Sequence, residues 1–200
     1  MPDTLHPFAK SITQEQAAHL LVTPSALIEL SMKDARQVVT YMRPKRIQMG
    51  TEFIHEGERA HTDYMMLILQ GDVTVESVVP GEKDNMVVSV IGPGNLIGEM
   101  GVLDGAPRSA SCTAATDLAV AVLSRAAMLR LVHAQPAVAA RLMLAVSKRL
   151  ADRLRDTTRK LKRFAQINSV LQAEIHSIMD NRSGAHVLKL EAPARGHAVT

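Results

Sequence analysis

The chain has 200 residues, of which 46% are hydrophobic and 22% are charged, and its net charge is +3. These values are ordinary for a soluble globular protein of one sizeable domain plus an extra element, or of two small domains. The absence of an apolar run of roughly 18 residues argues against a membrane span, and the N-terminus does not resemble a secretion signal. We therefore expect a cytoplasmic protein without membrane association. The single cysteine, Cys112, excludes an intramolecular disulfide framework.

Two helices are predicted at the start of the chain, in residues 1–45. Thr13 begins a capping-box pattern and predicts a helix over Gln14–Val22. Ser31 is a second capping residue and predicts a helix from Met32 to Met42.

From Arg46 the pattern changes to short β-rich runs separated by turn residues. This spacing predicts a small sandwich or barrel of strands. We assign residues 46–135 to this domain, including a short helix over Arg125–His133 that follows the strands. The predicted strands are Thr51–His55, Tyr64–Leu69, Val73–Val79, Met86–Ile91, Ala110–Ala114 and Leu118–Leu123.

A long helix is predicted over residues 136–180, because Pro136 suits a first helical turn and no Gly or further Pro follows until after residue 180. Its apolar residues follow a heptad repeat, with Asn168 at a core position that favours a parallel, in-register dimer. The alternative is a helix packed on its own domain. Residues 181–200 are predicted to be a mobile tail. The a positions are Leu154, Leu161, Asn168 and Ile175, and the d positions are Thr157, Phe164, Leu171 and Ile178.

The segment 98–111 places a carboxylate, a guanidinium and a hydroxyl in one short loop. A helical turn is predicted over 98–103, and its first N–H groups can receive an anion. Arg108 can add a charge-assisted fork to phosphate oxygens, and Ser109 can donate a further hydrogen bond. Ionised Glu99 only accepts hydrogen bonds, so it suits a ribose 2′-hydroxyl. The alternative role of Glu99 and Arg108 is a structural ion pair.

The same segment resembles the phosphate-binding cassette of the cyclic-nucleotide-binding domain family, which includes catabolite-activator-type regulators, kinase regulatory subunits and nucleotide-gated channels. The resemblance covers about residues 30–160. It implies an α+β, mainly β fold: an antiparallel jelly-roll β-barrel of eight strands with N-terminal helices and a long C-terminal dimerisation helix. The matching residues are Gly98-Glu99-Met100-Gly101-Val102-Leu103 and Pro107-Arg108-Ser109-Ala110-Ser111, with Gly50–Ile54, Glu56–Glu58 and Tyr64–Gly71 upstream.

The resemblance implies that Glu99 binds the ribose hydroxyl and that Arg108 binds the cyclic phosphate, assisted by Gly98 and Ser109. In the bacterial activators an arginine and a Thr-Ser pair on the long helix contact the base. Here Arg149 falls on the arginine position, and Arg149 or Arg153 can stack on a base through a cation–π contact. The predicted ligand-binding residues are Gly98, Glu99, Met100, Gly101, Arg108, Ser109, Ala110, Arg149 and Arg153.

We therefore expect a free-standing cAMP or cGMP receptor, a homodimer through residues 136–180, with no metal and no further cofactor. The activator relatives carry a helix-turn-helix domain of roughly 60 residues after the dimer helix, and about twenty residues follow the predicted helix here. A partner protein is therefore expected to detect ligand binding through the long helix. A cyclic-dinucleotide receptor is an alternative. We expect no enzyme activity, because the histidines lack metal-ligand spacing and Cys112 lacks a sequence-adjacent base.

A DNA-binding transcription regulator is a further alternative, because the long helix has an atypical basic stretch ahead of Asn168. The stretch resembles a basic region that leads into a zipper. The other interpretation is a solvated outer face, since Asp152 and Asp156 interrupt the charge. The basic residues are Lys148, Arg149, Arg153, Arg155, Arg159, Lys160, Lys162 and Arg163.

Overall fold

The computed structural model describes residues 13–78, 81 and 85–187. The chain divides into two compact units, residues 1–150 and residues 151–200. The elements are α1 (Gln14–Leu21), α2 (Met32–Thr40), β1 (Arg43–Ile47), β2 (Glu52–Ile54), β3 (Tyr64–Gln70), β4 (Val73–Ser77), β5 (Met86–Ile91), β6 (Leu96–Ile97), α3 (Glu99–Asp104), β7 (Ser111–Ala114), β8 (Leu118–Ser124), α4 (Arg125–Ala134) and α5 (Pro136–Val187).

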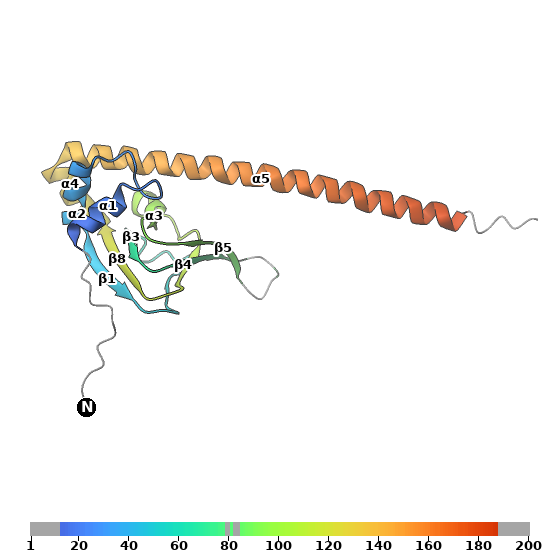
Figure 1. Cartoon of the computed structure of the whole chain (residues 1–200), viewed down its shortest axis with the longest axis horizontal. Coiled ribbons are helices and arrows are strands. Elements are labelled where there is room, and N and C mark those ends of the chain that lie inside the picture. Colours follow the sequence, from blue (N-terminus) through green and yellow to red (C-terminus); the bar gives the residue numbers. More distant parts are fainter. Residues whose placement is uncertain (1–12, 79–80, 82–84, 188–200) are drawn as a thin grey trace, which may run out of the picture. The chain divides into compact units, whose positions relative to one another are not determined.

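Eight strands form two four-stranded sheets in the first unit (Figure 1). The strand order is β1-β8-β3-β6 in one sheet and β2-β7-β4-β5 in the other, and every pairing is antiparallel. With the two N-terminal helices and the long C-terminal helix, this architecture confirms the predicted fold class.

Strand β3 separates two hydrophobic clusters because its successive side chains point to opposite faces. Met65 and Leu67 pack with the helices of the first unit, whereas Met66 and Ile68 pack between the two sheets. All four are at most 1% exposed. Burial on both faces explains why this strand is a continuous apolar run in the sequence.

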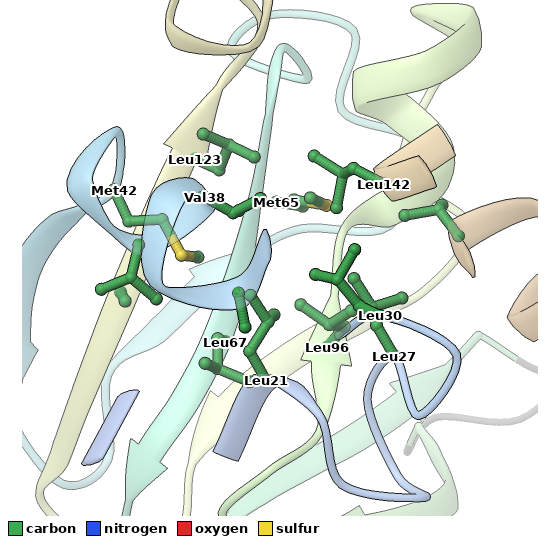
Figure 2. Packing of buried hydrophobic residues seen from close by; sticks show 14 of the residues in the cluster. Leu21, Leu27, Leu30, Val38, Met42, Met65, Leu67, Leu96, Leu123 and Leu142 are labelled. Atoms are coloured by element: carbon green, nitrogen blue, oxygen red, sulfur yellow. The ribbon is translucent and has the colours of Figure 1, made fainter. Parts of the chain in front are cut away.

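The cluster that contains Met65 and Leu67, called the helical cluster below, covers the outer face of the β1-β8-β3-β6 sheet. Figure 2 shows Leu21 of α1, Val38 of α2 and Leu142 of α5 gathered over side chains from β3, β6 and β8. The predicted capping box is confirmed: Gln16 N donates to Thr13 Oγ1 at 3.2 Å, and Thr13 N donates to Gln16 Oε1 at 2.9 Å.

The long helix does not begin a separate unit at Pro136. Residues 136–150 belong to the first unit, because α5 buries side chains in the helical cluster there. The buried residues of this segment are Val138, Ala139, Leu142, Ala145 and Val146. The helix also extends past the predicted end at residue 180, through Gly184 to Val187, since one glycine costs a helix only about 1 kcal/mol relative to alanine. The rest of the predicted tail, 188–200, lies outside the described residues.

Two strands were not predicted, β1 and β6. In β1, Pro44 and three basic residues give a sequence that does not resemble a strand, but β1 is at the edge of its sheet and four of its five residues are exposed. An edge strand tolerates proline because only one of its sides has to pair. Strand β6 has two residues, which is too short for a periodic pattern.

Candidate functional site

Helix α3 lies between two glycines that both adopt positive φ angles. Gly98 precedes it with φ of +76°, and Gly105 follows it with φ of +70°. The predicted helical turn is thereby confirmed. A Cβ atom on Gly98 would lie 2.7 Å from Arg108 Nη1 and 3.0 Å from the Tyr64 carbonyl oxygen. A Cβ on Gly101 would lie 3.1 Å from the same nitrogen. The two glycines therefore allow the guanidinium to contact the backbone of α3.

The Arg108 side chain is buried, with 5% of its surface exposed. Nη1 donates to the Gly98 carbonyl at 3.1 Å, and Nη2 donates to the carbonyls of His61 at 3.1 Å and Tyr64 at 3.2 Å. The guanidinium also lies over the Tyr64 ring, 4.5 Å from its centroid. In the described residues no acceptor reaches the buried Nε. Arg108 is thus fixed in place, and its Nε–H can still donate to an acceptor.

The loop between β2 and β3 forms hydrogen bonds with the backbone of Arg108. Gly57 N donates to the Arg108 carbonyl at 2.8 Å, and Arg108 N donates to the Glu58 carbonyl at 3.0 Å. His61 has φ of +52°, which is unusual for a residue other than glycine. Such conformations persist where the surroundings fix them, often at functional sites. Here the conformation accompanies a carbonyl that accepts from Arg108.

The remaining predicted cassette residues lie around this arginine. Glu99 is buried, with 1% of its surface exposed, at the first position of α3. Met100 is 44% exposed, and the exposed Ser109 hydroxyl donates to its sulfur at 3.9 Å. Ala110 packs against the cluster between the sheets. A buried carboxylate, a buried guanidinium and an exposed hydroxyl are suited to a ligand with a hydroxyl and an anionic group.

Comparison with known proteins assigns this arrangement to a family. The family model for the cyclic nucleotide-binding domain matches residues 44–135. This part of the chain belongs to that family. The matched residues hold all eight strands, except Arg43 of β1, together with α3 and α4.

Individual relatives agree with the match. A crystal structure of a cyclic nucleotide-binding domain from Methylobacillus flagellatus KT is 29% identical and has a TM-score of 0.61, over 72% of this chain and 79% of that one. The regulatory domain of Toxoplasma gondii PKA, crystallised with cAMP, is 28% identical with a TM-score of 0.52, over 58% of this chain and 43% of that one. The cAMP-activated global transcriptional regulator CRP of Salmonella typhimurium is 34% identical over 113 residues, which are 56% of this chain and 50% of that protein. The chain spans about half the length of the curated relatives it matches.

The two arginines predicted to contact the base, Arg149 and Arg153, are not among the residues that hold Arg108. Arg149 Nη1 donates to the carbonyls of Ser25 and Ala26, between α1 and α2. Arg153 is an exposed residue of the second unit. Their contacts with a nucleotide base remain predictions.

The cyclic nucleotide-binding domain contains site residues that the sequence did not indicate. Tyr64 and His61 hold Arg108 through backbone carbonyls, and every residue has a carbonyl, so the composition carries no signal for them. Burial raises the pKa of the Tyr64 phenol above its ordinary value, while the charge of Arg108 acts in the opposite direction.

In the ranges that the structure describes, no group of three or more His, Cys, Asp or Glu side chains is placed to bind a metal, and no helix is long and apolar enough to cross a bilayer.

Proposed function

We propose that the domain binds a cyclic mononucleotide, cAMP or cGMP, with the phosphate on Arg108 and the ribose 2′-hydroxyl on Glu99. The observation that carries this proposal is the buried Arg108 guanidinium, held by three carbonyls with its Nε still available. A buried N–H without an acceptor calls for an explanation, and a phosphate oxygen provides one. The cAMP-bound kinase domain and the cAMP-activated regulator among the relatives support cAMP as the first ligand to test.

Calorimetric titration of the full chain with cAMP, cGMP and cyclic di-GMP tests the proposal, with acyclic 5′-AMP as the control ligand. Replacing Arg108 by Gln removes hydrogen bonds to a charged group worth roughly 1.5–3 kcal/mol, so affinity should fall about 10- to 150-fold. The exposed arginine Arg130 of α4 provides the matched control, since Arg130→Gln should leave affinity unchanged. If both variants bind like the wild type, Arg108 does not contact the phosphate. Preference for cyclic di-GMP would favour the dinucleotide alternative.

The role of Glu99 is tested separately with 2′-deoxy-cAMP, which lacks the hydroxyl assigned to this carboxylate. The wild type should bind 2′-deoxy-cAMP more weakly than cAMP, because the hydrogen bond from the 2′-hydroxyl to the buried carboxylate is lost. Glu99→Gln should remove most of this discrimination. Equal binding of the two ligands by the wild type would contradict the assignment.

We further propose a parallel homodimer through the second half of α5. Every residue from 152 to 179 is exposed in the single chain. The a and d positions of the heptad repeat, called the seam below, include Leu161 and Phe164, which are 67% and 68% exposed. Apolar surface of this extent along one helix is typical of a partner interface. In a parallel pairing Asn168 meets Asn168 of the other copy and their amides can bond. In an antiparallel pairing that aligns the whole seam, Asn168 would face Phe164.

Cysteine cross-linking distinguishes the two orientations, since the one native cysteine, Cys112, is buried. In the parallel dimer, Leu171→Cys should form a disulfide with its own copy. In the antiparallel pairing, Leu171 faces Leu161, so only a mixture of Leu161→Cys and Leu171→Cys chains would cross-link. A chain that sediments as a monomer at micromolar concentration contradicts the dimer.

Signalling through α5 to a partner protein stays a prediction. Hydrogen exchange of the α5 amides with and without cAMP tests it, because a ligand shifts a conformation only when it binds one state better. The DNA-binding alternative has less support, since Arg155 and Arg159 pair with Asp152 and Asp156 on the same helix. A steeply salt-dependent mobility shift with duplex DNA would favour it.

A further inference from the structure

Tyr64 contacts Arg108 in two ways, through its backbone and through its ring. The carbonyl of Tyr64 accepts from Nη2 at 3.2 Å, and the guanidinium carbon lies 4.5 Å from the ring centroid. The Tyr64 hydroxyl donates to the Phe53 carbonyl at 3.5 Å, a long and weak bond. Burial raises the pKa of the phenol, and a hydrogen bond with the Arg108 side chain acts to lower it against this larger effect. The aromatic ring is the part of this side chain in close geometric contact with Arg108, and comparing Tyr64→Leu with Tyr64→Phe separates its effect from that of the hydroxyl.

The carbonyls and the ring divide the guanidinium between them. The three carbonyl bonds involve only the terminal nitrogens, whereas Nε is buried and no acceptor in the described segments reaches it. The Tyr64 ring lies against the guanidinium carbon. In this pose the side chain is held in one orientation and retains a donor for an acceptor from outside.

We infer that Tyr64 is a positioning residue that holds Arg108 in the orientation that binds the ligand phosphate. This inference rests on the proposed nucleotide site. A held arginine loses little conformational freedom when the phosphate arrives, whereas a mobile one reduces the apparent affinity by the fraction of time it spends in other orientations. The ring thus contributes to affinity without touching the ligand.

The expected effect follows from the strength of a cation–π contact. A partly desolvated contact of this kind corresponds to about a 5- to 30-fold change in an equilibrium constant. Tyr64→Leu should weaken cAMP binding by up to this factor. Tyr64→Phe keeps the ring and should bind within about twofold of the wild type. The loss in Tyr64→Leu should be equal for cAMP and 2′-deoxy-cAMP, because Arg108 is assigned to the phosphate and not to the ribose.

The chain offers a matched control, because it has only one other tyrosine, Tyr41. Tyr41 packs against the helical cluster, so Tyr41→Leu also removes a half-buried tyrosine ring. It should lower the free energy of unfolding without weakening cAMP binding. If Tyr41→Leu and Tyr64→Leu weaken binding equally, the effect of Tyr64 is general destabilisation and the inference is overturned.

A second measurement needs no ligand. In ¹⁵N-labelled protein the Arg108 Nε–H signal, identified by its loss in Arg108→Lys, should be shifted by the ring current in the wild type and in Tyr64→Phe. It should move to an ordinary position in Tyr64→Leu. Unchanged signals in all three proteins would show that the ring does not hold the guanidinium and would overturn the inference.

The two measurements separate this inference from the proposed function. If the wild type binds cAMP or cGMP and Tyr64→Leu binds equally well, the inference fails and the proposed function stands. If the wild type binds neither nucleotide, the proposed function fails, and with it the assignment of Arg108 to a phosphate. The Nε–H signals then decide whether Tyr64 holds the arginine at all.

Discussion

The ion pair between Asp34 and Arg141 joins α2 to the first turns of α5, and the two partners are unequally exposed. Arg141 Nε donates to Asp34 Oδ2 and Nη2 donates to Oδ1, each at 2.7 Å. The Asp34 side chain is 6% exposed, whereas that of Arg141 is 52% exposed. The Ser31 hydroxyl also donates to Asp34, at 2.7 Å. Removing one partner should therefore cost a different free energy from removing the other.

Arg141→Met keeps most of the aliphatic stem and leaves a buried carboxylate with the Ser31 hydroxyl. Breaking a fully buried pair costs about 3–5 kcal/mol, and the half-exposed arginine places this case lower, at about 2–3 kcal/mol. Asp34→Asn leaves a guanidinium that water can reach, so its cost should be smaller. The exposed pair of Arg36 with Glu15 is the matched control, because Arg36 also donates to a carboxylate through Nε and Nη2 but both partners are about half exposed. Arg36→Met should cost the least.

The cost of Arg141→Met should also depend on pH. The hydrogen bonds from Arg141 are the main cause that holds the pKa of Asp34 below its ordinary value, with a contribution from Ser31 against the opposing effect of burial. In the wild type, stability from this group is therefore present above about pH 4 and is lost as the pH falls through the lowered pKa. In the variant, burial still raises the pKa of Asp34 and the Ser31 hydroxyl still lowers it, but the main lowering cause is gone. The pKa of Asp34 should therefore be higher than in the wild type, and acid relieves the buried charge. The difference between the two proteins should shrink from pH 7 to pH 3.

Urea unfolding of the wild type and the three variants at pH 7 and pH 3 tests this reasoning. A cost for Asp34→Asn that equals or exceeds that of Arg141→Met would refute the argument from exposure. A cost for Arg141→Met that does not change with pH would refute the argument from the buried charge. The result also bears on function, because this pair fixes the start of the helix that we expect to respond to ligand.

Three further predictions concern other parts of the first unit. Gly98→Ala forces an alanine to φ of +76° and places its Cβ 2.7 Å from Arg108 Nη1. The free energy of unfolding, measured with urea, should therefore fall by at least about 1 kcal/mol, and the nucleotide affinity, measured by calorimetry, should fall with it. Arg108→Gln removes a charge that lowers the pKa of Tyr64, so the phenol should titrate at a higher pH, measured by ultraviolet absorbance in a Tyr41→Phe background. Val90 is 62% exposed on the edge strand β5, so Val90→Lys should reduce light scattering at high concentration and change the unfolding free energy by less than about 0.5 kcal/mol.

The sequence predicted those elements whose formation depends on their own apolar pattern. Strands β3 and β8 are long apolar runs because both of their faces are buried, and α1 and α2 begin at capping residues. It failed where the neighbours decide the structure. Strand β1 pairs with β8 in spite of Pro44, and the first turns of α5 join the first unit because the helical cluster has room for Leu142. Neither effect is visible in a local window.

For the candidate site, the sequence predicted residues for ligand contact but not the residues that hold Arg108 in place. Glu99 and Arg108 were predicted from residue type and spacing, and both are buried, Glu99 at the first position of α3. The acceptors of the arginine are backbone carbonyls, and which carbonyls converge depends on the path of the loop between β2 and β3. The predicted role of Arg149 stays untested. Counting along the helix assigned it to the base, whereas its guanidinium donates to carbonyls between α1 and α2.

Gly98, Gly101 and Arg108 form one structural unit, because the guanidinium lies where side chains at the two glycines would be. A glycine before a helix is usually explained by its φ angle, and Gly98 does need that freedom. Gly101, however, has no positive φ, and its side-chain position is taken up by the Thr62 carbonyl at 2.8 Å and by Arg108 Nη1 at 3.1 Å. The positions of the two glycines therefore follow from where the guanidinium lies. Arg108 comes ten residues after Gly98 and seven residues after Gly101. An arginine that contacts the backbone this closely leaves no room for a side chain at either glycine.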